Sequence, residues 1–150
     1  MDGMSVVHPS TPSNPEGRRI ITFGTFDLFH LGHVNVLRRA RALGDWLIVG
    51  VSSDELNAQK KGRRPYFSID ERLAIVGDNR FVDEVFIEES LEQKADYIRE
   101  YRADALVMGD DWQGRFDHYG SLCEVTYLPR TPEISSTRII TVVRADIDAA

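Results

Sequence analysis

The segment that decides the fold is Gly24-Thr25-Phe26-Asp27-Leu28-Phe29-His30-Leu31-Gly32-His33. The short apolar run before it predicts a buried strand over 19–23, and the amphipathic run after it predicts a helix that ends at Gly44. A loop between a strand and a helix N-terminus presents backbone N–H groups without partners at the positive end of the helix dipole. His30 and His33 can aim both imidazoles at one anion there. The segment therefore predicts a phosphate-binding loop.

Strands and helices alternate along the rest of the chain. A continuous apolar run predicts a second strand over 46–51, as expected for a parallel strand covered on both faces. Further strands are expected over 80–87, 105–109 and 125–128, and further helices over 69–79, 91–102 and 138–145. Capping boxes at Ser68 and Ser90 mark the starts of two of these helices. The alternation predicts a Rossmann-like α/β fold: a doubly wound, mostly parallel five-stranded sheet with helices on both faces.

Polar loops follow four of the five expected strands. They carry the two histidines, a basic segment over 60–65, the Asp110-Asp111-Trp112 run and the stretch 130–137. Ligands of doubly wound sheets bind outside the carboxyl ends of the strands, where the strand order reverses. These loops are therefore the expected walls of a binding site.

Size and composition narrow the function classes. The 150 residues suit one domain, expected over 18–150, after a Pro- and Ser-rich tail over 1–17 that we expect to be disordered. The net charge of -6 argues against binding to nucleic acid or to anionic membranes, and no apolar run is long enough to span a bilayer. The lone Cys123 excludes an internal disulfide, and no Cys/His spacing indicates a protein-held metal. We expect a cytoplasmic protein.

Two stretches carry a resemblance to a known family. The segment 24–33 resembles the HxGH signature of the nucleotidyltransferase superfamily, in the form found in glycerol-3-phosphate cytidylyltransferases, and 130–137 is similar to that family's second signature, Arg-Thr-x-x-Ile-Ser-Thr-Thr. The resemblance extends from Ile20 to Ile140. It implies that an acceptor, sn-glycerol 3-phosphate, attacks the α-phosphate of CTP directly, giving CDP-glycerol and pyrophosphate. It also implies Mg²⁺ as the counter-ion of the triphosphate, a homodimer, and a product that feeds surface polymers such as teichoic acids.

The resemblance also implies roles for individual residues. His30 and His33 would contact the phosphates of CTP, Lys60 would bridge the α-phosphate and the acceptor phosphate, and Arg130 would hold the β- and γ-phosphates. The further substrate-binding residues that it implies are Gly24, Thr25, Phe26, Asp27, Gly32, Arg72, Arg80, Asp83, Gly109, Asp111, Trp112, Thr131, Ile134, Ser135, Ser136 and Thr137. Structural roles remain open for several of them: Asp27 as a loop residue, Arg72 on a helix surface, Arg80 and Asp83 as a mutual pair, and Trp112 in the core.

Departures from the family pattern leave the acceptor open. Gly62 stands where relatives have a second lysine, and Leu91 stands where they have a tryptophan. These changes affect acceptor contacts more than nucleotide contacts. Alternative reactions therefore use phosphoethanolamine with CTP, or FMN with ATP. A nucleotide-binding sensor without catalysis is a further alternative, against which the intact histidine pair and Lys60 argue.

Overall fold

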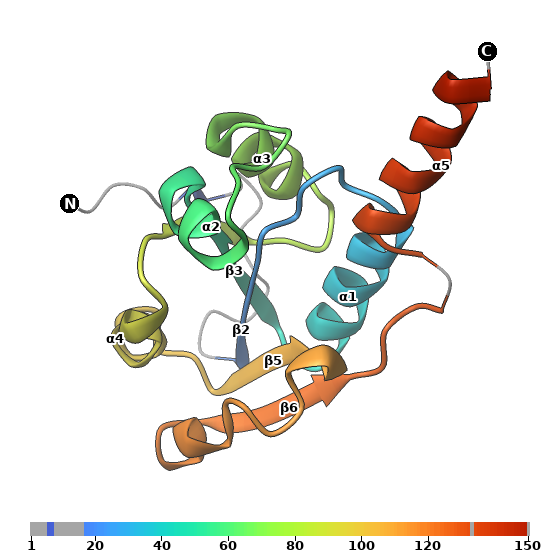
Figure 1. Ribbon diagram of the computed structural model, residues 1–150. Helices are drawn as coiled ribbons and strands as arrows, with labels where there is room; N and C mark the ends of the chain where they lie inside the picture. The colour runs from blue at the N-terminus through green and yellow to red at the C-terminus, as the bar shows by residue number, and fades with distance from the viewer. Residues whose placement is uncertain (1–5, 8–16, 133, 150) are drawn as a thin grey trace.

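The computed structural model describes residues 6–7, 17–132 and 134–149, and these form an α/β fold built on one sheet (Figure 1). The strands are β1 (Val6–Val7), β2 (Arg19–Gly24), β3 (Trp46–Ser52), β4 (Glu84–Glu88), β5 (Ala105–Gly109) and β6 (Glu124–Leu128). Their order in the sheet is β1-β4-β3-β2-β5-β6. The strands β2 to β6 pair in parallel, which confirms the predicted five-stranded sheet, and β1 adds an antiparallel edge to β4.

The β1 strand lies within the segment that we expected to be a tail. Val6 pairs with Val85, and Val7 pairs with Glu84. The expectation of disorder over 1–17 therefore does not hold for these two residues. Residues 1–5 and 8–16 of that segment lie outside the described part of the chain.

Two apolar clusters pack against the two faces of the sheet. The helices are α1 (Leu31–Ala42), α2 (Asp54–Lys61), α3 (Ile69–Gly77), α4 (Lys94–Glu100) and α5 (Ser136–Ala149), with short 3₁₀ turns η1 (Leu91–Gln93), η2 (Asp110–Trp112) and η3 (Asp117–Ser121). One cluster joins Ile20 of β2 to Leu37 of α1 and Val76 of α3. The other joins Ile21 of β2 to Ile98 of α4. Neighbouring strand residues point to opposite faces, so β2 contributes to both clusters.

Of the two predicted capping boxes, one is present in the structure and the other is not. The capping box at Ser68 is present, because Ser68 and Glu71 exchange hydrogen bonds at the start of α3. The box at Ser90 does not form: Ser90 Oγ accepts from the N–H of Glu92, a 3₁₀ turn follows, and α4 begins only at Lys94. The helix α2 extends to Lys61, and the next residue, Gly62, adopts the left-handed conformation with φ of 77° that commonly ends a helix.

The last helix, α5, projects from the body of the molecule (Figure 1). Its amino end packs beside the loop between β2 and α1, where Ser136 Oγ donates to the carbonyl oxygen of Asp27 at 3.0 Å. From Thr141 to Ala149 every residue is exposed. Among the described residues, no helix has the length and apolar character needed to cross a membrane.

Candidate active site

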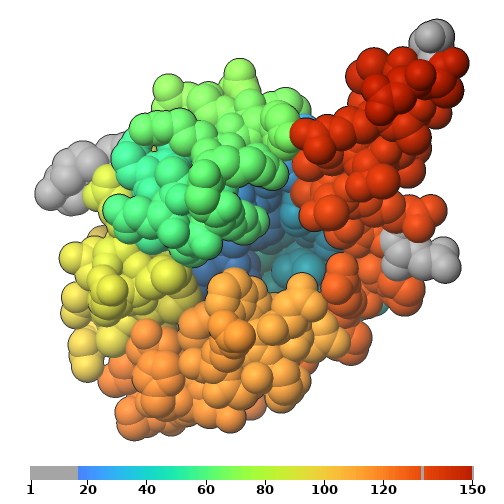
Figure 2. All heavy atoms as spheres, viewed as in Figure 1, coloured from blue at the N-terminus to red at the C-terminus, as the bar shows by residue number. Residues whose placement is uncertain are grey.

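A cavity of about 470 Å³ lies at the carboxyl ends of the parallel strands. Figure 2 shows this hollow between the segment that contains α2 and α3, the segment around residues 110–120, and α5. The polar residues that line it include Thr22, Thr25, Asp27, His33, Asn57, Lys60, Lys61, Arg63, Glu88, Lys94, Asp111, Ser136 and Thr137, and the apolar or small ones include Phe23, Gly24, Phe26, Val36, Leu91, Met108, Gly109, Trp112 and Phe116. Loops far apart in the sequence therefore form one site at the predicted edge of the sheet.

The two histidines hold each other and the start of α1 in place. His30 is the N-cap residue, and its Nδ1 accepts from the N–H of Gly32 at 3.0 Å. His33 Nδ1 accepts in turn from the N–H of His30 at 3.2 Å. The two rings stack with centroids 3.8 Å apart and 25° between their planes. Because each Nδ1 accepts a hydrogen bond, the proton of each neutral ring is on Nε2, which is left to donate to a ligand.

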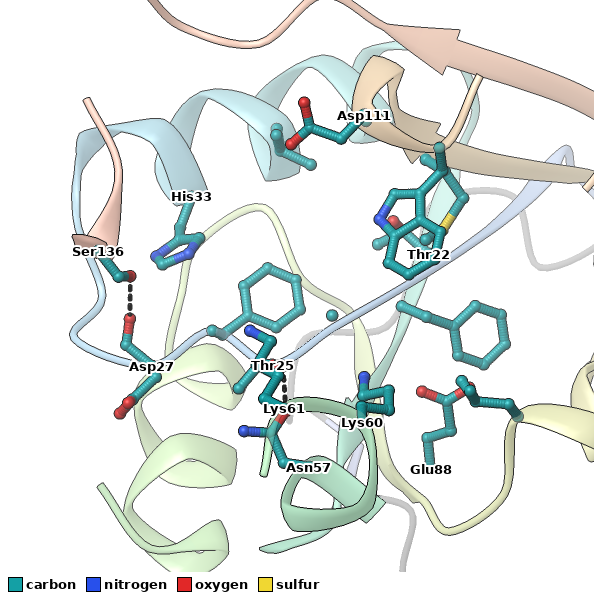
Figure 3. Close-up of a pocket in the computed structure, with 18 of the residues that line it drawn as sticks. Thr22, Thr25, Asp27, His33, Asn57, Lys60, Lys61, Glu88, Asp111 and Ser136 are labelled. Atoms are coloured by element: carbon teal, nitrogen blue, oxygen red, sulfur yellow. Dashed lines mark hydrogen bonds between the residues drawn. The ribbon is translucent and has the colours of Figure 1, made fainter. Parts of the chain in front are cut away.

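Burial keeps His33 neutral near pH 7. The pKa of His33 is lowered to about 3, chiefly by desolvation and also by the neighbouring His30, while the carboxylate of Asp27 opposes the shift. Burial also lowers the pKa of His30. His33 faces the cavity (Figure 3), whereas His30, which stacks on it, is not among the residues that line the cavity. The pair can therefore offer hydrogen-bond donors to phosphate without carrying a charge.

Close approach explains two glycines of this loop. A Cβ on Gly32 would lie 2.8 Å from Cε1 of His30 and 3.4 Å from Cγ2 of Ile134. A Cβ on Gly24 would lie 2.8 Å from the ring of Phe26. Any side chain at position 32 would thus displace the His30 ring from its cap. The loop also holds Phe26 and Leu28 at positive φ of 55° and 48°, a strained conformation for these residues.

Asp27 and Arg72 connect the loop to the rest of the protein. Asp27 lies at the cavity wall, but its carboxylate accepts from the N–H groups of Tyr66 at 2.8 Å and Phe67 at 2.9 Å. Arg72 is fully buried. It donates to the carbonyls of Thr25, Ser52 and Phe67, and it forms an ion pair with Asp54 at 2.6 Å. Arg72 is not among the residues that line the cavity, and this placement favours a role in holding the wall together over the expected substrate contact.

The last turn of α2 brings lysines to the cavity. Lys60 Nζ donates to Ser52 Oγ at 3.1 Å. Lys61 lines the cavity next to it (Figure 3). Burial lowers the pKa of both amines, and for Lys60 the carboxylate of Glu88 opposes that shift. Thr25 lies beside the same helix, where its hydroxyl donates to Asn57 Oδ1 of α2 at 2.7 Å (Figure 3). The expected phosphate lysine thus shares a cavity with His33.

The residues after β5 and β6 form the opposite rim. Gly109, Asp111 and Trp112 line the cavity. Arg130 is not among the lining residues, but it forms an exposed ion pair with the rim, with its Nη1 3.4 Å from Asp111 Oδ1. The following residue, Thr131, accepts from Asn35 Nδ2 of α1 at 2.9 Å, which fixes the segment beside the helix.

The amino end of α5 completes the wall. Ser136 and Thr137 line the cavity. Ser135 caps the helix, because its Oγ accepts from the N–H of Arg138 at 3.0 Å. The first N–H groups of this 14-residue helix therefore lie at the rim of a cavity that is also lined by three lysines, Lys60, Lys61 and Lys94.

Two expected site residues lie elsewhere. Arg80 and Asp83 precede β4, so they are at the amino ends of the strands, opposite the cavity. Asp83 accepts from the N–H of Leu47 at 2.8 Å and pairs with Arg41 at 3.1 Å, while Arg80 stacks on Phe81. The structure therefore does not bring them to the cavity with the other expected site residues, and they do not pair with each other as the structural alternative supposed.

The sequence reasoning missed Glu88 and Lys94. Both are almost completely buried, line the cavity, and form an ion pair. The expected site walls omitted the loop after the strand over 80–87, although Glu88 ends that strand as a charged residue after an apolar run. That position at a carboxyl strand end was the available signal.

No group of three or more His, Cys, Asp or Glu suited to a metal ion is present within 6–7, 17–132 and 134–149. Of the carboxylates at the cavity, Asp27 is bonded to backbone N–H groups, Glu88 is paired with Lys94, and Asp111 is paired with Arg130.

Comparisons with known proteins show the family to which this chain belongs. The model of the cytidylyltransferase-like family matches residues 21–142. Glycerol-3-phosphate cytidylyltransferases of Bacillus subtilis and Staphylococcus aureus are 49% and 46% identical over 122 residues, which cover 81% of this chain and 94% and 92% of those proteins. A crystal structure of a lipopolysaccharide core biosynthesis protein from Thermoplasma volcanium matches 77% of this chain and 98% of its own with a TM-score of 0.64 at 25% identity. The chain therefore belongs to the cytidylyltransferase-like family of nucleotidyltransferases.

Proposed function

We propose that this protein transfers a cytidylyl group from CTP to sn-glycerol 3-phosphate, which gives CDP-glycerol and pyrophosphate. The observation that carries the proposal is the shared cavity of His33, Lys60 and the amino end of α5. It supplies uncharged donors, a cation and a helix terminus to one polyanion. The similarity to glycerol-3-phosphate cytidylyltransferases over most of their length supports the choice of substrates.

This reaction requires the protein to position the two substrates and to stabilise the negative charge of the transition state. The nucleophile is an oxygen of the acceptor phosphate, which is already largely ionised near pH 7 because its second pKa is about 6. No general base is then required. The new P–O bond forms at the α-phosphorus of CTP as the bond to the β-phosphate breaks, and pyrophosphate leaves. Charge builds on oxygens around the α-phosphorus, where preorganised donors lower the barrier.

Residues from each wall of the cavity stabilise a part of this negative charge. His33, with His30 stacked behind it, donates from Nε2 to the phosphates, since its Nδ1 already accepts from the backbone. Lys60 contacts the α-phosphate and the acceptor phosphate. The N–H groups of Ser136 and Thr137 and the hydroxyl of Thr137 hold the β- and γ-phosphates at the start of α5, while the Ser136 hydroxyl stays bonded to Asp27.

We propose that Arg130 leaves Asp111 and binds the triphosphate when CTP enters the cavity. Its ion pair with Asp111 is exposed on both sides, and exposed pairs of this kind are weak. A triphosphate at the helix start can therefore take the guanidinium in a bidentate contact. Asp111 is then released for the base or the acceptor, beside Trp112.

Mg²⁺ fits this site as a companion of the nucleotide. The carboxylates at the cavity are engaged with backbone N–H groups or cations, whereas a triphosphate brings its own hard oxygen ligands. When bound, the ion neutralises charge on the leaving pyrophosphate. The protein's part is to orient the metal-nucleotide complex through the lysines and the α5 terminus.

A substrate panel tests the reaction. Pyrophosphate release is measured with CTP or ATP, each paired with glycerol 3-phosphate, phosphoethanolamine or FMN. We expect release with CTP and glycerol 3-phosphate, and formation of CDP-glycerol confirmed by mass spectrometry. Release with CTP and phosphoethanolamine only, or with ATP and FMN only, would contradict the acceptor or the nucleotide. CTP binding without release in every arm would identify a sensor instead.

We also propose that the protein acts as a homodimer. Part of α5 is apolar and exposed, with Val143 at 50% and Ile147 at 67% exposure. Its basic residues, Arg138 and Arg144, precede the acidic Asp146 and Asp148, so an antiparallel copy of the same helix would meet opposite charges. Sedimentation of the wild type and of Ile147→Glu tests this, and a monomeric wild type would contradict it. We place the reaction in the cytoplasm, and its product in the supply of surface polymers such as teichoic acids.

A further inference from the structure

Four polar side chains form a connected network at the floor of the cavity. Lys60 Nζ of α2 donates to Ser52 Oγ at 3.1 Å, and Ser52 Oγ lies 3.5 Å from Glu88 Oε1. The other carboxylate oxygen of Glu88 accepts from Lys94 Nζ of α4. Figure 3 shows Lys60 and Glu88 on the same side of the pocket. We call Lys60, Ser52, Glu88 and Lys94 the floor network.

Glu88 and Lys94 are buried, whereas Lys60, at the other end of the network, is partly exposed. Glu88 is 1% exposed and Lys94 is 2% exposed. The ammonium of Lys94 also lies 4.4 Å from the centroid of the Phe23 ring and 5.4 Å from that of Phe116. The two aromatic rings therefore contact the ammonium in addition to its ion pair with Glu88. Lys60, at the end of a flexible chain on the last turn of α2, is the movable member.

Glu88 would hold Lys60 directly if Lys94 were absent. A buried carboxylate without a cation is unfavourable, and Lys60 reaches it through a single hydroxyl. A lysine fixed in such a pair would have to break it before it could contact a phosphate. With Lys94 in place, Glu88 is already neutralised, and Lys60 is held by the uncharged Ser52.

We infer that the Glu88–Lys94 pair is a positioning device that keeps the charge of Lys60 available to the substrate phosphates. The inference rests on the proposed function, in which Lys60 contacts phosphate. Lys94 acts through Glu88 and Lys60 and does not itself bind substrate.

The charges around Lys60 agree with this division of roles. Burial lowers the pKa of Lys60, the carboxylate of Glu88 raises it, and the positive charges of Lys61, Lys94 and Arg72 lower it. Lys94 therefore offsets the attraction of Glu88 for Lys60 across the network. Since Lys94 is held on two sides by Glu88 and Phe23, it is poorly placed to leave the pair for a ligand.

The test compares a variant that removes one charge of the Glu88–Lys94 pair with a variant that removes both. In Lys94→Gln, Glu88 is left without its cation, and we expect kcat to fall about tenfold to a hundredfold while the KM for CTP changes little. In the double variant Glu88→Gln/Lys94→Gln, no buried charge remains to capture Lys60, and we expect kcat to return to within about threefold of the wild type. Arg99→Gln removes a positive charge from the exposed side of the same helix and serves as the control.

Each outcome decides the matter. A double variant as inactive as Lys94→Gln, with a raised KM for glycerol 3-phosphate in both, would show that Lys94 binds the acceptor itself and would overturn the inference. Unchanged kcat in Lys94→Gln would overturn it as well. If the double variant does not fold, a crystal structure of Lys94→Gln decides: we expect Lys60 Nζ within about 4 Å of the Glu88 carboxylate, and Lys60 still on Ser52 would contradict the inference.

The two proposals fail in different ways. If the wild type forms no CDP-glycerol, the proposed function fails, and the nucleotidyl transfer found in the substrate panel becomes the assay. If the wild type is active but the double variant gives no rescue, only the positioning role fails.

Discussion

The two sides of the cavity are built in different ways. On the histidine side, His30 and His33 are fixed by hydrogen bonds to backbone groups within three residues of themselves. On the lysine side, Lys60, Glu88 and Lys94 come from three elements that meet only in the folded sheet. The first side is preorganised by local sequence, so its donors can be uncharged and rigid. The second relies on balanced charges, and that balance exists only in the tertiary structure.

Arg72 links the two sides, so its loss should have the largest effect. It donates to Thr25 on the histidine side and to Ser52 on the lysine side, and it pairs with Asp54. Arg72→Met leaves these carbonyls and the carboxylate without their partner, and we expect a loss of about 3–5 kcal/mol in unfolding free energy. Urea denaturation measures it.

A matched control separates stability from substrate binding. Arg130 is exposed, so Arg130→Met should change stability by about 1 kcal/mol or less but raise the KM for CTP. The opposite pattern, with Arg72→Met stable and defective in CTP binding, would restore the substrate contact that the sequence suggested for Arg72.

Substitutions of His33 test whether the histidine side works through Nε2. His33→Ala removes both the cap acceptor and the donor, and we expect kcat to fall about 100- to 1000-fold. His33→Asn can keep an acceptor for the N–H of His30 but has no donor at the position of Nε2. We expect it to match the activity loss of His33→Ala while retaining more thermal stability. An active Asn variant would show that the ring matters only as a cap. Circular dichroism confirms folding in both.

The smallest expected effect is on stability in mild acid. The pKa of His33 in the folded protein is about 3, below the ordinary value of 6.5. Between these two pH values His33 is therefore protonated in the unfolded chain but neutral in the folded protein. Stability from this residue is therefore complete above about pH 6.5 and is lost as pH falls toward 3. Between pH 7 and 5 we expect His33→Asn to lose up to about 2 kcal/mol less than the wild type.

Urea denaturation at the two pH values measures this difference. Parallel losses in the two proteins would mean that His33 takes up its proton readily in the folded state. Its role as a neutral donor would then need revision.

Local signals account for the parts of the fold that could be predicted. The apolar runs at 19–23 and 46–51 specify buried parallel strands, because only a strand covered on both faces is apolar throughout. The capping pair Ser68 and Glu71 specifies the start of α3 within four residues. The box at Ser90 failed because Ser90 Oγ accepts from the N–H of Glu92 instead, so a 3₁₀ turn forms first and α4 begins only at Lys94.

The sequence by itself determined the HxGH loop, because its histidines, glycines and helix start act within ten neighbouring residues. Only the tertiary structure decided that Arg72 is a buried brace, that Arg80 and Asp83 lie at the far edge, and that Glu88 and Lys94 lie at the cavity floor. The physical reason is that the role of a charged side chain depends on burial and on partners distant in the chain. Neither is encoded in local spacing.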